Sequence, residues 1–229
     1  MATDTWSRTH EEMIDALAEG LQAVEDKLAS LSEEDWARPT LLRPLDPDLP
    51  PWNVLQLAGH FDFFMGMTMG LVGEPQDAPP AFDRVSFQIT DRHQFAPGIY
   101  QVMIDHAAGH TPTTILDTAR GTFKRALGVI RNTPPDTVGP AFYGLIRLDE
   151  FVPTRVLEVV IHAMDLTDAL GEPSLPLPRG TTLVAEILDE LVARKRVPGR
   201  PADLEDDLAF IRAASGRGEH PDPRYPVIG

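Results

Sequence analysis

The stretch from Arg155 to Leu166 constrains the fold most, because it is apolar on almost every side. Eight of its twelve residues are aliphatic or methionine: Val156, Leu157, Val159, Val160, Ile161, Ala163, Met164 and Leu166. A helix with so little polar surface is buried on most of its circumference. We therefore expect this helix at the centre of a helical protein, covered by other helices.

The four polar residues of this stretch are Arg155, Glu158, His162 and Asp165. At about 100° per residue they fall within one arc of roughly 80°, so they form a single polar stripe along the helix. Two interpretations stay open: a solvated outer face, or a buried polar site whose charges are paired or bound to a metal. The narrowness of the polar stripe favours the buried site, because solvated faces are usually wider.

Apolar periodicity predicts three further long helices and therefore an all-α fold, a four-helix bundle with long crossover connections. The four helices are expected at residues 14–31, 54–71, 112–131 and 149–170. Asn53 and Gln56 form a capping box at the start of the second helix, and Thr111 with Pro112 starts the third. No alternating strand pattern competes with this prediction.

The rest of the chain is expected to be loop and shorter helices. Residues 74–98 are rich in Pro and Asp and predict a loop, followed by a short helix at 99–108. Two helices, at 183–191 and 202–215, follow Gly171 and are separated by a Pro/Gly break at 198–201. We expect two units: the bundle with its site at 1–171, and a C-terminal helical extension with a Pro-rich tail at 172–229.

Composition excludes several classes of protein. The chain has 35 acidic and 20 basic residues, a net charge of −15, so nucleic acid and anionic membranes are poor partners. It has no cysteine, so any thiol chemistry must use a thiol from elsewhere.

The longest stretch of the chain without Asp, Glu, Lys or Arg is residues 49–61, which is shorter than the roughly 20 residues of a membrane span. No secretory signal is visible, and we expect a cytoplasmic protein.

Glu158 and His162 are spaced to hold one ion, because residues four apart meet over one helical turn. An imidazole and a carboxylate suit Zn²⁺, Ni²⁺ or Fe²⁺ equally well. A third donor must come from a facing helix, and the second helix offers His60 on its apolar side. The other pair with this spacing, His106 and His110, lies where Gly109 breaks the helix, and we expect an exposed surface pair.

Four stretches of the sequence carry a family resemblance. They are LSEEDWARPT (31–40), PWNVLQLAGHF (51–61), LDEFVPTRVLEVVIHAMDL (148–166) and FIRAASGR (210–217). In these stretches the chain resembles the mycothiol-dependent maleylpyruvate isomerase family, within the wider DinB-like group of metal-binding four-helix bundles. The resemblance implies a divalent metal, usually zinc, held by His60, Glu158 and His162.

The resemblance also implies roles for two further residues. Asp165 matches the aspartate of the family's H-x-x-D-L pattern, and it either orients the His162 imidazole or anchors the helix packing. Arg155 matches the arginine before the ExxxH motif, and it is expected to pair with Glu158 or Asp165 or to meet an anionic substrate. We therefore expect Arg155 and Asp165 to serve catalysis.

The chain departs from the family at two places. The family commonly has C-P-G-W before the second helix, where this chain reads LLRPLDPDLPPW, which is longer and lacks the cysteine. The segment after the fourth helix is expected to be too short for the full second domain of the isomerases themselves. Both places lie where a substrate or cofactor would touch the protein.

Three protein ligands leave one metal position open, as in catalytic zinc sites. A thiol at that position is held as thiolate, and the resemblance implies mycothiol acting on a small electrophilic substrate, by isomerisation or S-transfer. The alternatives are a hydrolase that uses metal-bound water and a non-catalytic, stress-related bundle.

Candidates for holding substrate carboxylates are Arg84, Arg92, Arg147 and Arg155. A homodimer is the default expectation for a bundle of this size.

Overall fold

The computed structural model describes residues 6–42, 44–89, 92–195 and 199–228. Within these residues the helices are α1 (His10–Ala29), α2 (Glu33–Trp36), α3 (Val54–Gly73), α4 (Arg92–Ala108), α5 (Pro112–Asn132), α6 (Leu148–Leu170), α7 (Pro178–Arg194) and α8 (Asp207–Ala214). Two short 3₁₀ helices lie at Ser86–Gln88 and Ala202–Leu204, and two strands, β1 (Val138–Ala141) and β2 (Gly144–Arg147), form an antiparallel hairpin.

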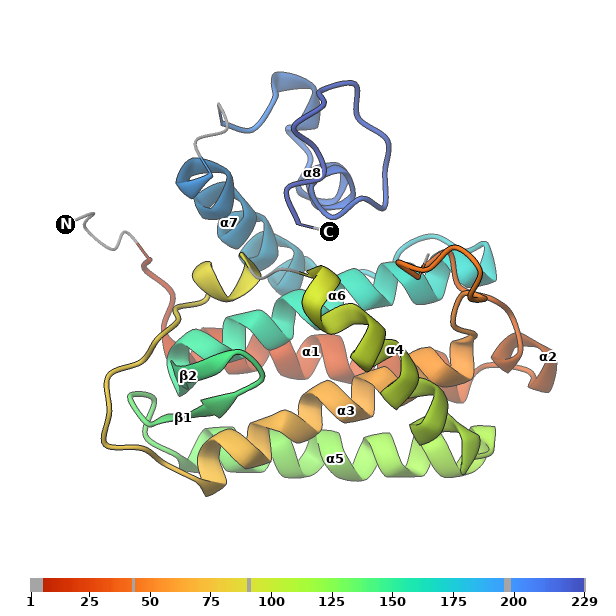
Figure 1. The fold of residues 1–229 in the computed structure, drawn as a ribbon, viewed down its shortest axis with the longest axis horizontal. Helices are drawn as coiled ribbons and strands as arrows, with labels where there is room; N and C mark the ends of the chain where they lie inside the picture. The colour runs from red at the N-terminus through yellow and green to blue at the C-terminus, as the bar shows by residue number, and fades with distance from the viewer. Residues whose placement is uncertain (1–5, 43, 90–91, 196–198, 229) are drawn as a thin grey trace.

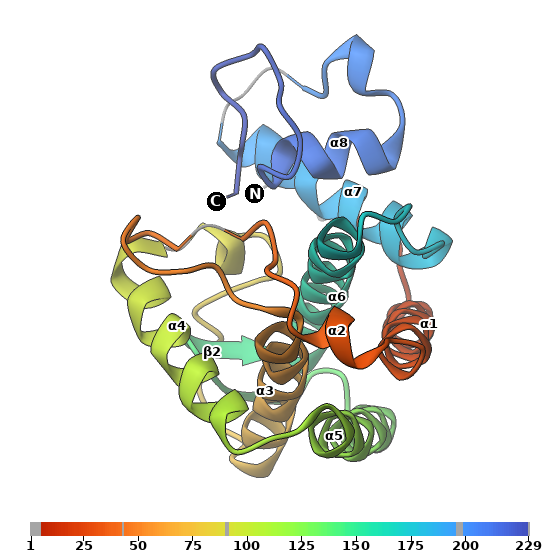
Figure 2. The same ribbon diagram turned by 90° about the vertical axis from the view of Figure 1, so that its right-hand side faces the viewer.

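The predicted four-helix bundle is confirmed. It consists of α1, α3, α5 and α6, with α3 packed against α5 and α6, and α1 packed against the same two helices (Figure 1). Seen from the end in Figure 2, these four helices surround one core while α4 lies outside α3. The capping box of Asn53 and Gln56 is formed, and Gly171 ends α6 in the left-handed conformation with φ 70°.

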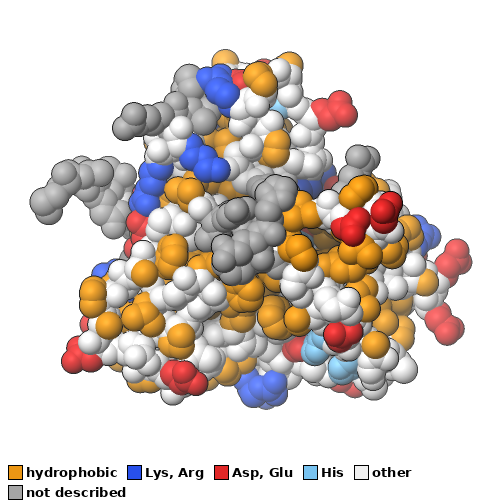
Figure 3. Space-filling model, viewed as in Figure 1, with side chains coloured by type: hydrophobic (Ala, Val, Ile, Leu, Met, Phe, Trp, Pro, Cys, Tyr) orange, Lys and Arg blue, Asp and Glu red, His pale blue; other side chains and the backbone are white. Residues whose placement is uncertain are grey.

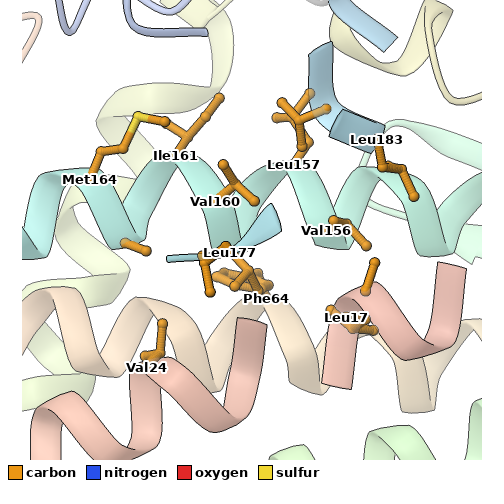
Figure 4. Packing of buried hydrophobic residues seen from close by; sticks show 14 of the residues in the cluster. Leu17, Val24, Phe64, Val156, Leu157, Val160, Ile161, Met164, Leu177 and Leu183 are labelled. Carbon is orange, nitrogen blue, oxygen red and sulfur yellow. The ribbon is translucent and has the colours of Figure 1, made fainter. Parts of the chain in front are cut away.

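The core is built around α6, as its apolar sequence predicts. Of its 23 residues 17 are buried. Figure 4 shows its aliphatic side chains, Val156 and Val160 among them, in one cluster with Leu17 of α1 and Phe64 of α3. Burial of such side chains contributes about 1.5–3 kcal/mol each, so α6 is held rigidly, and so is the polar stripe that it carries.

The structure differs from the sequence prediction in one unpredicted hairpin and in the bounds of two predicted helices. The hairpin of β1 and β2 was not expected, because strands of four residues containing Gly139 and Pro140 show no alternating pattern. The helix expected at 99–108 begins at Arg92 and contains Pro97, which reads as a helix breaker in the sequence. The helix expected at 202–215 is a 3₁₀ turn followed by α8, because Asp206 caps a new helix start by accepting from the Ala209 N–H.

The C-terminal residues pack along one side of the bundle. There α7 lies on α6 and α1, and α8 lies on α7 (Figure 2). The division of the chain at residue 171 stays a prediction. None of the described helices combines the length and the apolar character that crossing a membrane requires.

Candidate metal centre and its pocket

Two helices bring the three predicted ligands together. His60 comes from α3, and Glu158 and His162 come from neighbouring turns of α6. The Nε2 atoms of His60 and His162 are 3.1 Å apart, and the Glu158 Oε2 atom is 3.7 Å from the first and 3.2 Å from the second. A point equidistant from the three atoms lies about 1.9 Å from each, so an ion at zinc-ligand distances of about 2.0–2.2 Å fits just above their plane.

Asp165 fixes the orientation of the His162 ring. The His162 Nδ1 atom donates to the Asp165 Oδ2 atom at 2.8 Å, which leaves the Nε2 lone pair directed at the other two ligands. Arg217 holds the same carboxylate, with Nε and Nη2 donating at 3.0 and 2.9 Å. Burial alone would raise the pKa of Asp165, but the hydrogen bond from His162 and the charge of Arg217 lower it to about 2. Asp165 is therefore ionised and links His162 to the segment after α8.

The charges of the three predicted ligands suit a divalent cation. Burial would raise the pKa of Glu158, but hydrogen bonds from both histidines hold it well below its ordinary value. Burial lowers the pKa of His60, whereas for His162 the hydrogen bonds that it donates to the Asp165 and Glu158 carboxylates outweigh burial and raise its pKa. The set thus offers one carboxylate, one neutral imidazole and one imidazole made more basic by Asp165. A divalent ion held by these three groups would displace any proton on the two Nε2 atoms, because ligating imidazoles are neutral.

The polar stripe faces the interior, so its interpretation as a solvated face is wrong. Arg155 and Asp165 are only 2% and 3% exposed. The predicted pairing of Arg155 with Glu158 or Asp165 is not formed, and in the described part of the chain Arg155 has no ion-pair partner. Its Nε atom donates to the Thr154 Oγ1 atom at 3.2 Å, and its guanidinium carbon lies 4.5 Å from the centre of the Phe151 ring.

A small cavity of about 80 Å³ adjoins the three predicted ligands. Its walls come from α3, α4, α6, the tip of the hairpin and the 3₁₀ helix Ser86–Gln88. The lining residues are His60, Phe63, Phe64, Met67, Phe87, Gln88, Ile99, Phe142, Tyr143, Arg155 and Glu158. Sequence reasoning missed the hairpin and Gln88, because nothing local marks a loop residue that tertiary packing places against a cavity.

The other singled-out histidines lie outside this centre. His106 is not on a short exposed segment, as we expected, but on α4, half-buried, with its Nε2 atom 3.0 Å from the Asp62 Oδ2 atom of α3. The His110 ring lies 5.3 Å from the His106 ring. Because Asp62 engages His106, this pair ties α4 to α3.

Two of the predicted carboxylate-binding arginines are engaged by the protein itself. Arg84 donates to Glu150 and Glu190, and Arg147 donates to Asp149. The Arg92 side chain lies outside the described part of the structure. Of the three candidates whose side chains the structure describes, Arg155 lines the cavity.

Replacing Asp165 by asparagine is expected to weaken zinc binding about 10- to 100-fold, the usual cost of losing a carboxylate that orients a ligating histidine. The neutral amide no longer raises the basicity of His162 and leaves Arg217 without its partner charge. Competition of the purified variants with a chromogenic chelator measures this. Asp222→Asn is the matched control, because that carboxylate pairs with Arg224 at the surface. Equal affinity in wild type and Asp165→Asn would contradict the role given to Asp165.

Comparison with known proteins yields one family and one fold. The family model described as the mycothiol maleylpyruvate isomerase N-terminal domain matches residues 17–167. Crystal structures of the mycothiol-dependent maleylpyruvate isomerase and of a histidine-to-alanine mutant of it are similar, with TM-scores of 0.63 and 0.64 at 16% identity. Each comparison covers 92% of this chain and 90% of the other. No curated protein sequence matches.

The coverage corrects one expectation from the sequence. The segment after the fourth helix was expected to be too short for the second domain of the isomerases, yet the similarity extends over 90% of the solved chains. The segment therefore builds most of the same architecture with α7, α8 and the residues between them. At 16% identity over the compared residues, the sequence did not show this correspondence.

Proposed function

Because the chain belongs to the mycothiol maleylpyruvate isomerase N-terminal domain family, we propose that it is a metal-dependent enzyme with mycothiol as its thiol cosubstrate. The observation that carries the proposal is the convergence of His60, Glu158 and His162 beside a cavity. When bound, the metal supplies an open position at which a thiol is held as thiolate, a nucleophile that a chain without cysteine lacks. Zn²⁺ is the ion proposed first, with Ni²⁺ or Fe²⁺ as alternatives.

The protein's own residues prepare the cavity for this chemistry. Asp165 keeps a proton on the Nδ1 atom of His162 and so leaves its Nε2 atom free for the metal. The rings of Phe64, Phe87 and Tyr143 line the cavity and lower the local dielectric constant, which strengthens electrostatic interactions inside. Arg155 supplies the positive charge toward which negative charge on a substrate is drawn.

The proposed reaction is addition of the thiol to an electrophilic carbon of a small substrate. Where the substrate is a cis alkene next to a carbonyl, forming and then breaking the carbon–sulfur bond allows rotation and gives the trans isomer. Where the substrate carries a leaving group, the product is an S-conjugate. The family favours isomerisation, because its description names an isomerase.

Two measurements on the purified protein test the proposal. We expect about one divalent ion per chain after dialysis, and turnover of a cis-alkene electrophile only when mycothiol is added. The absence of a bound divalent ion would contradict the metal site and leave the non-catalytic alternative. Hydrolytic turnover that needs no thiol would instead favour the hydrolase.

The remaining predictions from the sequence concern the protein in the cell. A homodimer and a cytoplasmic location stay predictions, and size-exclusion chromatography with light scattering measures the first of them.

A further inference from the structure

The two predicted histidine ligands are oriented in different ways. The His162 Nδ1 atom donates to the Asp165 carboxylate at 2.8 Å, whereas the His60 Nδ1 atom is buried and has no hydrogen-bond partner among the described residues. A hydrogen bond to the second nitrogen usually fixes the ring of a ligating histidine, and rotation about its Cβ–Cγ bond is otherwise weakly restrained. Within the described chain, packing therefore sets the orientation of the His60 ring.

The Trp52 indole packs against the His60 ring. Their ring centres are 5.2 Å apart and their planes are tilted by 43°. Phe64 also contacts His60, at 5.4 Å between ring centres, but it lies one turn further along the same helix and moves with it. Aromatic rings at these separations attract each other. Trp52 lies before α3 and so restrains the His60 ring from outside its helix.

Trp52 is itself held at its backbone and at its ring. Its carbonyl oxygen accepts from the backbone N–H and the Oγ1 atom of Thr40 at 2.7 and 2.8 Å, which joins the two ends of the segment between α2 and α3. Its indole stacks on the Tyr100 ring of α4, with 6.3 Å between centres and 17° between planes. The Tyr100 hydroxyl in turn donates to the Pro50 carbonyl at 2.8 Å. These contacts keep the indole beside His60.

The segment that ends at Trp52 is the one in which the sequence departs from the family. It extends toward α4 (Figure 2), and apolar side chains cover much of the face on which α4 lies (Figure 3). Trp52 directly precedes the N-cap residue Asn53 of α3. The departure therefore adjoins a predicted ligand and does not lie on remote surface.

We infer that Trp52 is a positioning residue for the metal. Its indole holds the His60 ring so that the Nε2 atom is directed at Glu158 and His162, as the Asp165 carboxylate does for His162. The inference rests on the metal site of the proposed function and adds a residue that contributes no ligand. Because Tyr100 packs on the same indole, the metal and α4 are coupled through Trp52.

Zinc affinity, measured by competition of the purified protein with a chromogenic chelator, tests the inference. Trp52→Leu is expected to weaken zinc binding about threefold to tenfold, the effect of losing an aromatic pair. Trp52→Phe keeps a ring and is expected to weaken it less than about twofold. Trp36→Leu is the matched control, because Trp36 is buried in the core and makes no ring contact with a histidine in the described chain. Circular dichroism confirms that each variant folds.

Fluorescence separates positioning from a general effect on stability. Ni²⁺, one of the proposed ions, quenches the fluorescence of an indole that lies close to it. Titration of metal-free protein with Ni²⁺ is expected to quench tryptophan fluorescence in wild type and in Trp36→Phe. Trp52→Phe is expected to lose most of this quenching although it still binds the ion.

Two results overturn the inference: Trp52→Leu and Trp36→Leu have the same zinc affinity, or Trp52→Phe keeps the full quenching by Ni²⁺. If Trp52→Leu fails to fold, the fluorescence of wild type and Trp52→Phe still decides. A wild type that binds neither ion would contradict the proposed function, and the inference with it. Metal binding that is indifferent to Trp52 would contradict the inference alone.

Discussion

His162→Ala is expected to lower the bound metal to less than about a tenth of an ion per chain and thiol-dependent turnover about 1,000-fold or more. The Nε2 atom of His162 is one corner of a triangle of ligand atoms, 3.1 Å from the Nε2 atom of His60 and 3.2 Å from the Glu158 carboxylate. Removing it leaves two donors, too few to hold an ion against dialysis. Mass spectrometry of the dialysed protein and an absorbance assay with mycothiol measure the two effects.

A matched control separates loss of a ligand from loss of a histidine. His110→Ala removes a histidine whose ring contacts His106 and lies outside the group of predicted ligands, so its metal content is expected to equal that of wild type. Glu158→Gln provides a second test, because it keeps the size of the side chain and removes the charge. Full metal content in both His162→Ala and Glu158→Gln would refute the site.

Gly139→Ala is expected to reduce the free energy of unfolding by about 3 kcal/mol, the cost of a severe overpacking. A Cβ atom at Gly139 would lie 1.9 Å from the Leu71 carbonyl oxygen and 2.7 Å from its carbon, and both are backbone atoms of α3. The hairpin must then move away from α3, and with it the tip residues Phe142 and Tyr143 that line the cavity. Urea denaturation monitored by circular dichroism measures the change.

Gly70→Ala is the control for Gly139→Ala. Gly70 lies in α3 and is exposed, and a Cβ atom at this position would have no neighbouring atom within 4 Å outside its own helical turns. Alanine in an exposed helix is more favourable than glycine, so stability is expected to rise by up to about 1 kcal/mol. If both substitutions changed stability by the same amount and in the same direction, close packing of β1 on α3 would not explain the need for glycine at position 139.

The local part of the site could be predicted because it lies on one helix. Glu158, His162 and Asp165 are separated by three or four residues, and that spacing alone places them on one face. His60 was harder to assign, since its place opposite α6 depends on the packing of two distant helices. Periodicity offered it on the apolar side of the second helix, the family motif matched the same position, and the structure places its Nε2 atom 3.1 Å from that of His162.

Of the alternatives that the sequence left open for Arg155, pairing with Glu158 or Asp165 is not formed, and the reason is geometric. Side chains on a helix lean toward its N-terminus, and the Arg155 guanidinium accordingly lies over Phe151, one turn earlier, while Glu158 is engaged by both histidines. Sequence spacing shows which residues share a face but not which neighbour each side chain reaches. Gln88 and Arg217 were missed because their contacts are made across the fold.

The contact between Arg217 and Asp165 thermodynamically links metal binding to the docking of the segment after α8. Asp165 accepts from His162 on one side and from Arg217, beyond α8, on the other. If docking of this segment raises the affinity for the metal, then metal binding must strengthen the docking by the same factor, because coupling free energies are reciprocal. A bound ion would thus be expected to slow hydrogen exchange around α8, a segment that contributes no ligand to it.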